Sequence, residues 1–181
     1  MTKERSGSLG ELIRRLRLCD GDTCYLTVME TIEVSNDELE SVVTWNDERR
    51  ARVSIYRDED FELLVTCWEA GQKGGIHDYG ADHAWTLVLN GALQEERFIV
   101  DPSSGNLEKV GKVKLEEGDF SYMGGGNNIH RMSNLADSRT IALHLYRRPV
   151  DSWNVYDETY GDAVSQKVWW DETVKSEAFP V

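Results

Sequence analysis

Gly75–Gly91 reads GIHDYGADHAWTLVLNG, and this stretch decides the fold. The apolar run Trp85–Leu89 is closed by Asn90-Gly91, two residues that tolerate positive φ. We therefore predict a strand that ends in a hairpin turn. One residue separates His77 from Tyr79, so on a strand both side chains point to the same face.

Similar short runs recur along the chain from about residue 51, and turn signals rich in glycine, asparagine and aspartate separate them. Many short strands at regular spacing are typical of a sandwich or barrel. We expect strands in the runs that are richest in branched and aromatic residues: Phe61–Trp68, Trp85–Leu89, Arg97–Val100, Lys112–Leu115, Thr140–Tyr146 and Val164–Trp170.

The first residues carry helical signals instead. A three-and-four spacing that begins at Leu9 and ends at Leu16 follows Ser8, a good N-cap, and a second short helix is expected after Ser35. At 181 residues the chain has the length of about one domain. The predicted class is mainly β, one domain over residues 1–181, with a helical cap over 1–50 and a β-barrel over 51–181.

Composition excludes several functions. The chain has 20 Lys and Arg against 33 Asp and Glu, a net charge of −13, so nucleic acid and anionic membrane surfaces are poor partners. No apolar stretch approaches the roughly 20 residues that span a bilayer, and no signal-peptide core follows Met1. Cys19, Cys24 and Cys67 are odd in number and suggest no disulfide framework or zinc module. A reducing, cytoplasmic setting is expected.

Three further features are interpreted as structural. Cys67 lies in an apolar strand and is expected to be a buried, inert thiol. The pairs Arg14-Arg15 and Arg49-Arg50 are interpreted as salt-bridging surface in an acidic chain, and Trp169-Trp170 as packing of a C-terminal strand.

Histidine and tyrosine are the residues that could carry chemistry. All four histidines lie between residues 77 and 144; His144 and Tyr146 repeat the His-x-Tyr spacing, and His130 follows a glycine-rich stretch. Donors on distant strands can converge on a metal inside a barrel, and imidazoles suit iron, copper, nickel and zinc. Buried structural histidines and core tyrosines would show the same spacing, so both interpretations stay open.

Three segments together resemble the cupin superfamily, and within it the thiol dioxygenases of the cysteine dioxygenase family. They are Gly75–Trp85 (GIHDYGADHAW), Gly118–Asn134 (GDFSYMGGGNNIHRMSN) and Ile141–Pro149 (IALHLYRRP). The upstream segment Phe61–Gly71 (FELLVTCWEAG) also fits, and the resemblance runs from about Arg50 to Asp157. It implies a single cupin barrel, a jelly-roll-like double-stranded β-helix.

The resemblance also implies a metal site. The family binds one non-haem ferrous iron through three histidines, whose positions are His77, Tyr79 and His130 in this chain. Iron is therefore the expected metal, with another divalent transition metal as the alternative. Tyr79 departs from the pattern: it could be a tyrosinate ligand, stand off the metal, or mark a lost site. Asp78 and His83 are considered as substitutes but not favoured; the odd offset of Asp78 from His77 aims it at the opposite strand face.

Other positions acquire roles through the same resemblance. Tyr146 matches the active-site tyrosine, and His144 its partner; the serine that completes this relay is Ala142 here. Ala84 replaces the cysteine that some members crosslink to the tyrosine. Substrate binding is expected at Trp68 and at Arg52, which matches the carboxylate-binding arginine, with Arg57 as an alternative and Arg147 and Arg148 in reserve.

The leading hypothesis is a dioxygenase that adds both atoms of O₂ to a small thiol, of the cysteine or mercapto-carboxylate type, and yields a sulfinic acid. Two alternatives stay open. One is a two-His-one-Tyr cupin that performs another oxidation, or a lyase or isomerase reaction with tyrosinate as base. The other is a degenerate cupin that binds a ligand without turnover. The sequence does not indicate the oligomeric state.

Overall fold

The computed structural model describes residues 7–80, 83–124, 126, 128–158 and 160–174. Its helices are α1 (Leu9–Arg17), α2 (Asp22–Thr31) and α3 (Asn36–Val42). Its strands are β1 (Ala51–Arg57), β2 (Phe61–Trp68), β3 (Ile76–His77), β4 (His83–Asn90), β5 (Ala92–Val100), β6 (Leu107–Glu116), β7 (Phe120–Gly124), β8 (Ile129–Ser133), β9 (Thr140–Arg147), β10 (Ser152–Tyr156), β11 (Ala163–Lys167) and β12 (Glu172–Thr173).

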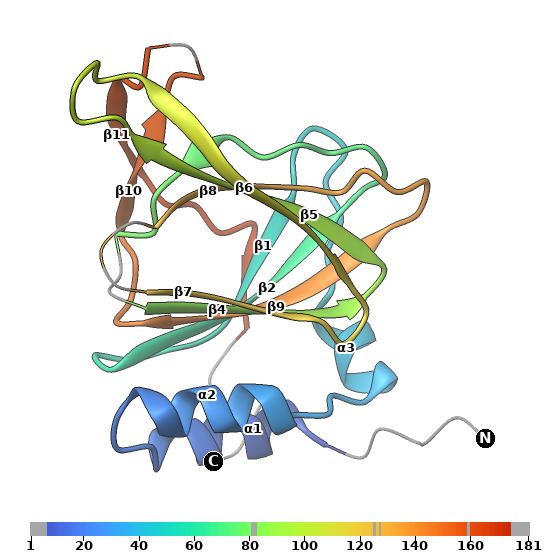
Figure 1. The fold of residues 1–181 in the computed structure, drawn as a ribbon. Helices are drawn as coiled ribbons and strands as arrows, with labels where there is room; N and C mark the ends of the chain where they lie inside the picture. The colour runs from blue at the N-terminus through green and yellow to red at the C-terminus, as the bar shows by residue number, and fades with distance from the viewer. Residues whose placement is uncertain (1–6, 81–82, 125, 127, 159, 175–181) are drawn as a thin grey trace.

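Two six-stranded sheets face each other (Figure 1). The first has the order β12-β1-β2-β9-β4-β7 and the second β11-β10-β3-β8-β5-β6. The helices lie against the outer side of the first sheet. This is a mainly β, jelly-roll-like fold, as the sequence predicts, although it consists of two facing sheets and not of one closed barrel.

The predicted hairpin at Asn90-Gly91 is wrong. β4 pairs with β7 and β9 in the first sheet, whereas β5 pairs with β6 and β8 in the second. The turn is therefore a corner that carries the chain from one sheet to the other. Gly91 has a φ of 81°, and a Cβ there would come within 2.4 Å of the Thr140 hydroxyl oxygen. Glycine fits because the corner packs directly on β9.

Both predicted helices form. Ser8 caps α1 by accepting the Glu11 amide at 3.0 Å, and Ser35 caps α3. α2 was not predicted, because its sequence DTCYLTVMET mixes β-branched with apolar residues and its N-cap is Gly21. Threonine hydroxyls inside α2 bond back to carbonyls one turn earlier, as Thr31 does to Thr27 at 2.7 Å.

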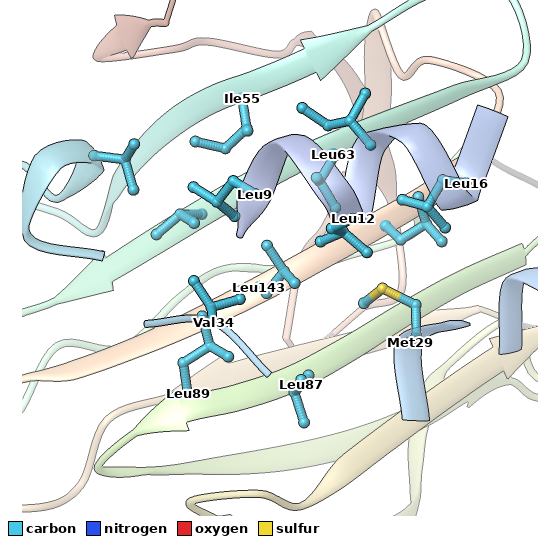
Figure 2. Packing of buried hydrophobic residues seen from close by; sticks show 14 of the residues in the cluster. Leu9, Leu12, Leu16, Met29, Val34, Ile55, Leu63, Leu87, Leu89 and Leu143 are labelled. Carbon is cyan, nitrogen blue, oxygen red and sulfur yellow. The ribbon is translucent and has the colours of Figure 1, made fainter. Parts of the chain in front are cut away.

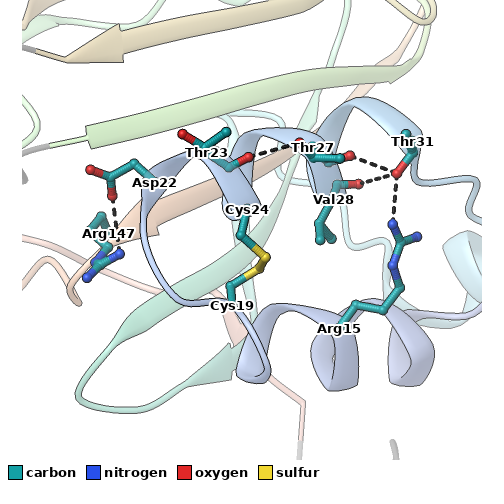
Figure 3. Close-up of a disulfide and its surroundings, with 9 residues drawn as sticks. All are labelled: Arg15, Cys19, Asp22, Thr23, Cys24, Thr27, Val28, Thr31 and Arg147. Atoms are coloured by element: carbon teal, nitrogen blue, oxygen red, sulfur yellow. Dashed lines mark hydrogen bonds and ion pairs between the residues drawn. A yellow bond between two sulfur atoms is a disulfide. The ribbon is translucent and has the colours of Figure 1, made fainter.

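A disulfide joins α1 to α2, contrary to the prediction of none. Cys19 follows α1 and Cys24 lies in the first turn of α2, so the tight turn between the helices brings the two thiols together (Figure 3). The cysteine count therefore no longer supports a reducing setting. Cys67 is the buried free cysteine, as predicted, and burial raises the pKa of its thiol to about 11.

The first sheet is buried on both faces, and alternate residues serve different purposes. On β2, Leu63, Val65 and Cys67 face the helices, whereas Thr66 and Trp68 face the second sheet. β9 follows the same rule, since Leu143 and Leu145 lie in the helix-side core. Figure 2 shows that core, with the leucines of α1 packed among those of the sheet. This alternation leaves the other face free to carry polar groups.

No helix in the described part of the chain combines the length and apolarity that crossing a bilayer requires.

Docking of α1 can be tested with two leucines. Leu12 is fully buried against the first sheet, whereas Leu18, next to the end of α1, is 73% exposed. Because Leu12→Ala leaves a cavity in the helix-side core, it should lower the free energy of unfolding by about 3 kcal/mol. Leu18→Ala should change it by less than about 0.5 kcal/mol. Chemical denaturation measures both; equal effects would contradict the described packing.

Candidate functional site

A narrow cavity of about 10 Å³ lies between the sheets. Strands β1, β2 and β9 of the first sheet and strands β3 and β8 of the second contribute its walls. Its lining is unusually polar for a protein interior: Arg50, Arg52, Thr66, Trp68, His77, Tyr79, His130, Met132, His144 and Tyr146. Most of the residues that the sequence singled out therefore meet in one place.

His77 and His130 form the centre of this cavity. They are direct partners in the β3–β8 ladder, and their ring centroids are 4.8 Å apart. Nδ1 of His77 lies 2.9 Å from the carbonyl oxygen of Gly75. Because a carbonyl only accepts, Nδ1 carries the proton and Nε2 keeps its lone pair. Burial, followed by the repulsion of His130 and Arg50, holds the pKa of His77 well below its usual value, so the ring is neutral.

His130 is oriented by a buried carboxylate. Its Nδ1 lies 3.0 Å from Oε1 of Glu95, whose other oxygen accepts from Ser121 at 2.7 Å and from Arg97 at 3.0 Å. Burial alone would raise the pKa of Glu95, but hydrogen bonds from His130 and Ser121 and the charge of Arg97 lower it to about 2. The ionised carboxylate therefore fixes the proton on Nδ1 of His130.

The remaining nitrogen of His130 fits a metal. Nε2 is fully buried and has no hydrogen-bond partner, a costly arrangement for a polar atom unless a ligand completes it. A histidine that binds a metal through one nitrogen usually donates the other to a carboxylate or carbonyl. His130 does this to Glu95 and His77 to Gly75, so both residues fit as ligands of a divalent metal.

Tyr79 lies at the other edge of the His130 ring. Its hydroxyl is 3.1 Å from Nδ1, the nitrogen that faces Glu95, and not beside Nε2. Burial raises the pKa of Tyr79 well above its usual value, and Tyr146 and Glu95 raise it further. Across the described residues, no three His, Cys, Asp or Glu side chains gather where they could hold a metal. The imidazole ligands available are thus His77 and His130.

His144 is held by two threonines. Its Nε2 lies 2.8 Å from the Thr66 hydroxyl and its Nδ1 3.0 Å from the Thr86 hydroxyl. The Thr66 oxygen also accepts the indole N–H of Trp68 at 3.0 Å. Both nitrogens of His144 thus contact threonine hydroxyls, and the centroid of its ring lies 6.2 Å from that of Tyr146. The two threonine hydroxyls therefore contact the ring nitrogens, and Ala142 stands where the family has its serine.

Arg52 lines the cavity from β1. It is 1% exposed and stands over the Trp153 ring at 4.8 Å. Its Nε donates to the Trp169 carbonyl at 3.2 Å, while its Nη2 is buried without a partner. Burial raises the pKa of the neighbouring Tyr146, and the charge of Arg52 opposes that rise.

Arg50 corrects one sequence interpretation. Arg49 is at the surface and pairs with Asp171, but Arg50 lines the cavity and does not belong to a salt-bridging surface. Arg50 directly precedes β1 and lies two residues before Arg52. Its guanidinium group lies beside Trp169, which the sequence placed in a strand but which lies beyond β11. An alternation count carried back from Arg52 would have found Arg50.

Arg57 does not fit the substrate-binding role considered for it. It lies outside the polar cavity and pairs with Asp151 and with Glu62. Arg147 pairs with Asp22 on α2, so it too is engaged elsewhere (Figure 3).

The two weak metal-ligand alternatives also face away from the cavity. His83 contacts Tyr122 at 2.7 Å and Asp22 at 3.3 Å, and Asp78 accepts from Asn154 and Tyr156. Asp78 has an odd offset from His77, whereas His83 belongs to β4 and not to β3.

Glu95 and the two threonines were missed. Glu95 stands beside Glu96 in a charged run, LQEERF, that resembles solvated surface. On β5, however, Glu95 is fully buried between the sheets, whereas Glu96 pairs on the other face with Arg131 and Lys109. Only the pairing of Arg97 with His130 across β5 and β8 shows which of the two glutamates reaches the site.

Comparisons with known proteins give similarities in sequence and in fold. The family model "Cysteine dioxygenase type I" matches residues 8–159. The chain is 28% identical over 162 residues to "Cysteine dioxygenase type 1" from Homo sapiens, which covers 85% of this chain and 81% of that protein. The bovine protein of the same name is 25% identical over 146 residues and covers 71% and 73%.

A solved structure supports the fold. An uncharacterized conserved protein with a double-stranded beta-helix domain from Klebsiella pneumoniae superposes with a TM-score of 0.51 at 14% identity. The match covers 71% of this chain and 87% of that one.

Glu95 and Glu96 provide a matched test of the carboxylate behind His130. Glu95→Gln removes the charge that fixes the proton on Nδ1, so binding of Co²⁺ or Fe²⁺ should weaken by about 10-fold or more. Glu96→Gln changes the adjacent residue on the opposite strand face and should leave the affinity unchanged. Anaerobic competition with a chelator measures both. Equal affinities in the two variants would show that Glu95 does not support the metal site.

Proposed function

Because this chain belongs to the cysteine dioxygenase type I family, we propose that it is a thiol dioxygenase that converts a small thiol and O₂ into a sulfinic acid. Both oxygen atoms go to the sulfur, so that R–SH and O₂ give R–SO₂H without another reductant. The proposed metal is ferrous iron, held by His77 and His130. The observation that carries the proposal is the pair of imidazole lone pairs in the same cavity as the buried, unpartnered Nη2 of Arg52.

Bound iron would supply redox chemistry and a Lewis-acidic centre that favours the thiolate form of a thiol. The protein supplies position. Arg52 offers a buried, unpartnered N–H group that suits a substrate carboxylate. Tyr146 lies on the same wall and keeps its proton, because burial raises its pKa, so its hydroxyl can donate to bound substrate. Trp68 and Met132 close the cavity with apolar surface and limit the entry of water.

We propose that Tyr79 does not ligate the metal. Its hydroxyl lies at Nδ1 of His130, and burial favours the neutral phenol over the tyrosinate that a ligand would need. Tyr79 then acts with Glu95 to orient His130. His144 also acts indirectly. Thr66 and Thr86 hold its ring in place, and the ring supports the wall that carries Tyr146.

Oxygen consumption tests the proposed reaction. Iron-reconstituted protein should consume one O₂ per sulfinate formed with cysteine or 3-mercaptopropionate as substrate. His77→Ala and His130→Ala should each lower the rate by at least about 100-fold, because each removes a metal ligand. His83→Ala removes a histidine outside the cavity and should retain activity. A folded, iron-loaded protein that consumes no O₂ with any thiol would contradict the dioxygenase assignment and favour a cupin that binds ligand without turnover.

Spectroscopy of the ferric protein tests the place of Tyr79. With the phenol off the metal, the visible spectrum should lack a tyrosinate-to-iron charge-transfer band, and Tyr79→Phe should leave the spectrum unchanged. Tyr146→Phe serves as the comparison for the loss of a neighbouring phenol. A visible band that disappears only in Tyr79→Phe would instead establish a two-His-one-Tyr site and reopen the alternative oxidation or lyase chemistry.

A further inference from the structure

We propose that the cavity selects a thiol that carries two carboxylates, with Arg52 receiving one and Arg50 the other. The inference rests on the proposed function for the thiol group, but the pair of arginines can be tested without any turnover. A mercapto-dicarboxylate is therefore the substrate class that we assign to this site.

Arg50 is placed as a second anion receptor. It is two residues before Arg52 and lines the same cavity, together with His77 and Tyr146. Its guanidinium group lies over three indole rings, 5.3 Å from Trp68, 5.6 Å from Trp153 and 5.3 Å from Trp169. A guanidinium group stacked on aromatic faces keeps its N–H groups in its own plane, where they can form the two parallel hydrogen bonds that a carboxylate accepts.

No carboxylate among the described residues pairs with Arg50. Burial, followed by the repulsion of Arg52, lowers the pKa of Arg50 to about 10, so the group is still charged at neutral pH. The nearby acids are engaged elsewhere. Asp171 binds Arg49, Asn46 and the backbone of Arg52, and Glu62 binds Arg57 and the Trp170 indole.

Two like charges close together in a protein interior are costly unless counter-charges accompany them. One carboxylate satisfies one guanidinium group and leaves the second unpaired. The charges of a site that holds both metal and substrate lead to the same conclusion. Two arginines and a divalent metal, less the charge of Glu95, leave three positive charges, and a thiolate with two carboxylates brings three negative ones. A thiol with a single carboxylate brings two.

The same reasoning explains why cation–π contact alone is a poor account of Arg50. Such contacts stabilise a guanidinium group by about 0.5–2 kcal/mol, which does not supply a counter-charge. An anion in the cavity provides that counter-charge.

Non-thiol ligands test the site in the metal-free protein. Succinate carries two carboxylates and propionate one, and neither can be oxidised as a thiol. Binding can be followed by calorimetry and by tryptophan fluorescence, because three indoles contact Arg50. Succinate should bind about 10-fold or more tightly than propionate. Equal affinities for the two acids in the wild-type protein would overturn the inference.

Variants assign the preference to one residue. Arg50→Gln should remove the preference for succinate, and Arg50→Lys, which keeps the charge, should retain part of it. Arg52→Gln should weaken binding of both acids. Arg49→Gln changes the adjacent arginine, which pairs with Asp171, and should retain the preference. Thermal unfolding checks that each variant is folded. A folded Arg50→Gln protein that still prefers succinate would overturn the inference.

Turnover then separates this inference from the proposed function. Iron-loaded protein should show a kcat/KM for mercaptosuccinate at least about 10-fold above that for 3-mercaptopropionate. If succinate is preferred but no thiol is oxidised, the dioxygenase assignment fails and the dicarboxylate site stands. If 3-mercaptopropionate is oxidised equally well and succinate is not preferred, the dioxygenase assignment stands and the role of Arg50 fails.

Discussion

Strict alternation across the first sheet is the constraint on which the rest of the structure depends. β2 and β9 pair without a break from Phe61–Arg147 to Trp68–Thr140, and every second side chain packs against the helices. A slip of one residue would turn Leu63 and Val65 toward the cavity and the polar residues into the helix-side core. The apolar packing of α1 and α2 therefore fixes which residues of β1, β2 and β9 can reach the second sheet.

Because of that alternation, the two sheets contribute different chemical groups to the cavity. The first sheet contributes the guanidinium groups and the hydroxyls, whereas the second contributes the two imidazoles and Glu95. Glu95 is the fully buried acid that holds His130, and its pKa of about 2 shows that its neighbours outweigh the cost of its burial. One wall of the cavity thus carries guanidinium charges and the other carries imidazole lone pairs, inside a chain whose net charge is −13.

Periodicity predicts the strands well but not their partners. Phe61–Trp68 is observed with the predicted bounds, and Thr140–Tyr146 is extended by one residue. The turn at Asn90-Gly91 was misassigned because its local chemistry suits a hairpin and a sheet-to-sheet corner equally. The resemblance located His77 and His130, whose convergence follows from their ladder pairing. Glu95 could not be recognised, because the adjacent Glu96 hid which of the two glutamates reaches the site. Arg50 was grouped with the exposed Arg49, although it lies two residues before Arg52.

The proposals for Arg50 and Tyr79 are physically connected. The charge of Arg50 lowers the pKa of Tyr79, but burial and the neighbouring Glu95 and Tyr146 outweigh it and keep the phenol neutral. An anion bound at Arg50 would cancel that stabilisation of tyrosinate and favour the phenol still more. Substrate binding and a protonated Tyr79 therefore support each other. A second guanidinium group in this cavity is better matched to an anionic substrate than to an anionic ligand at position 79.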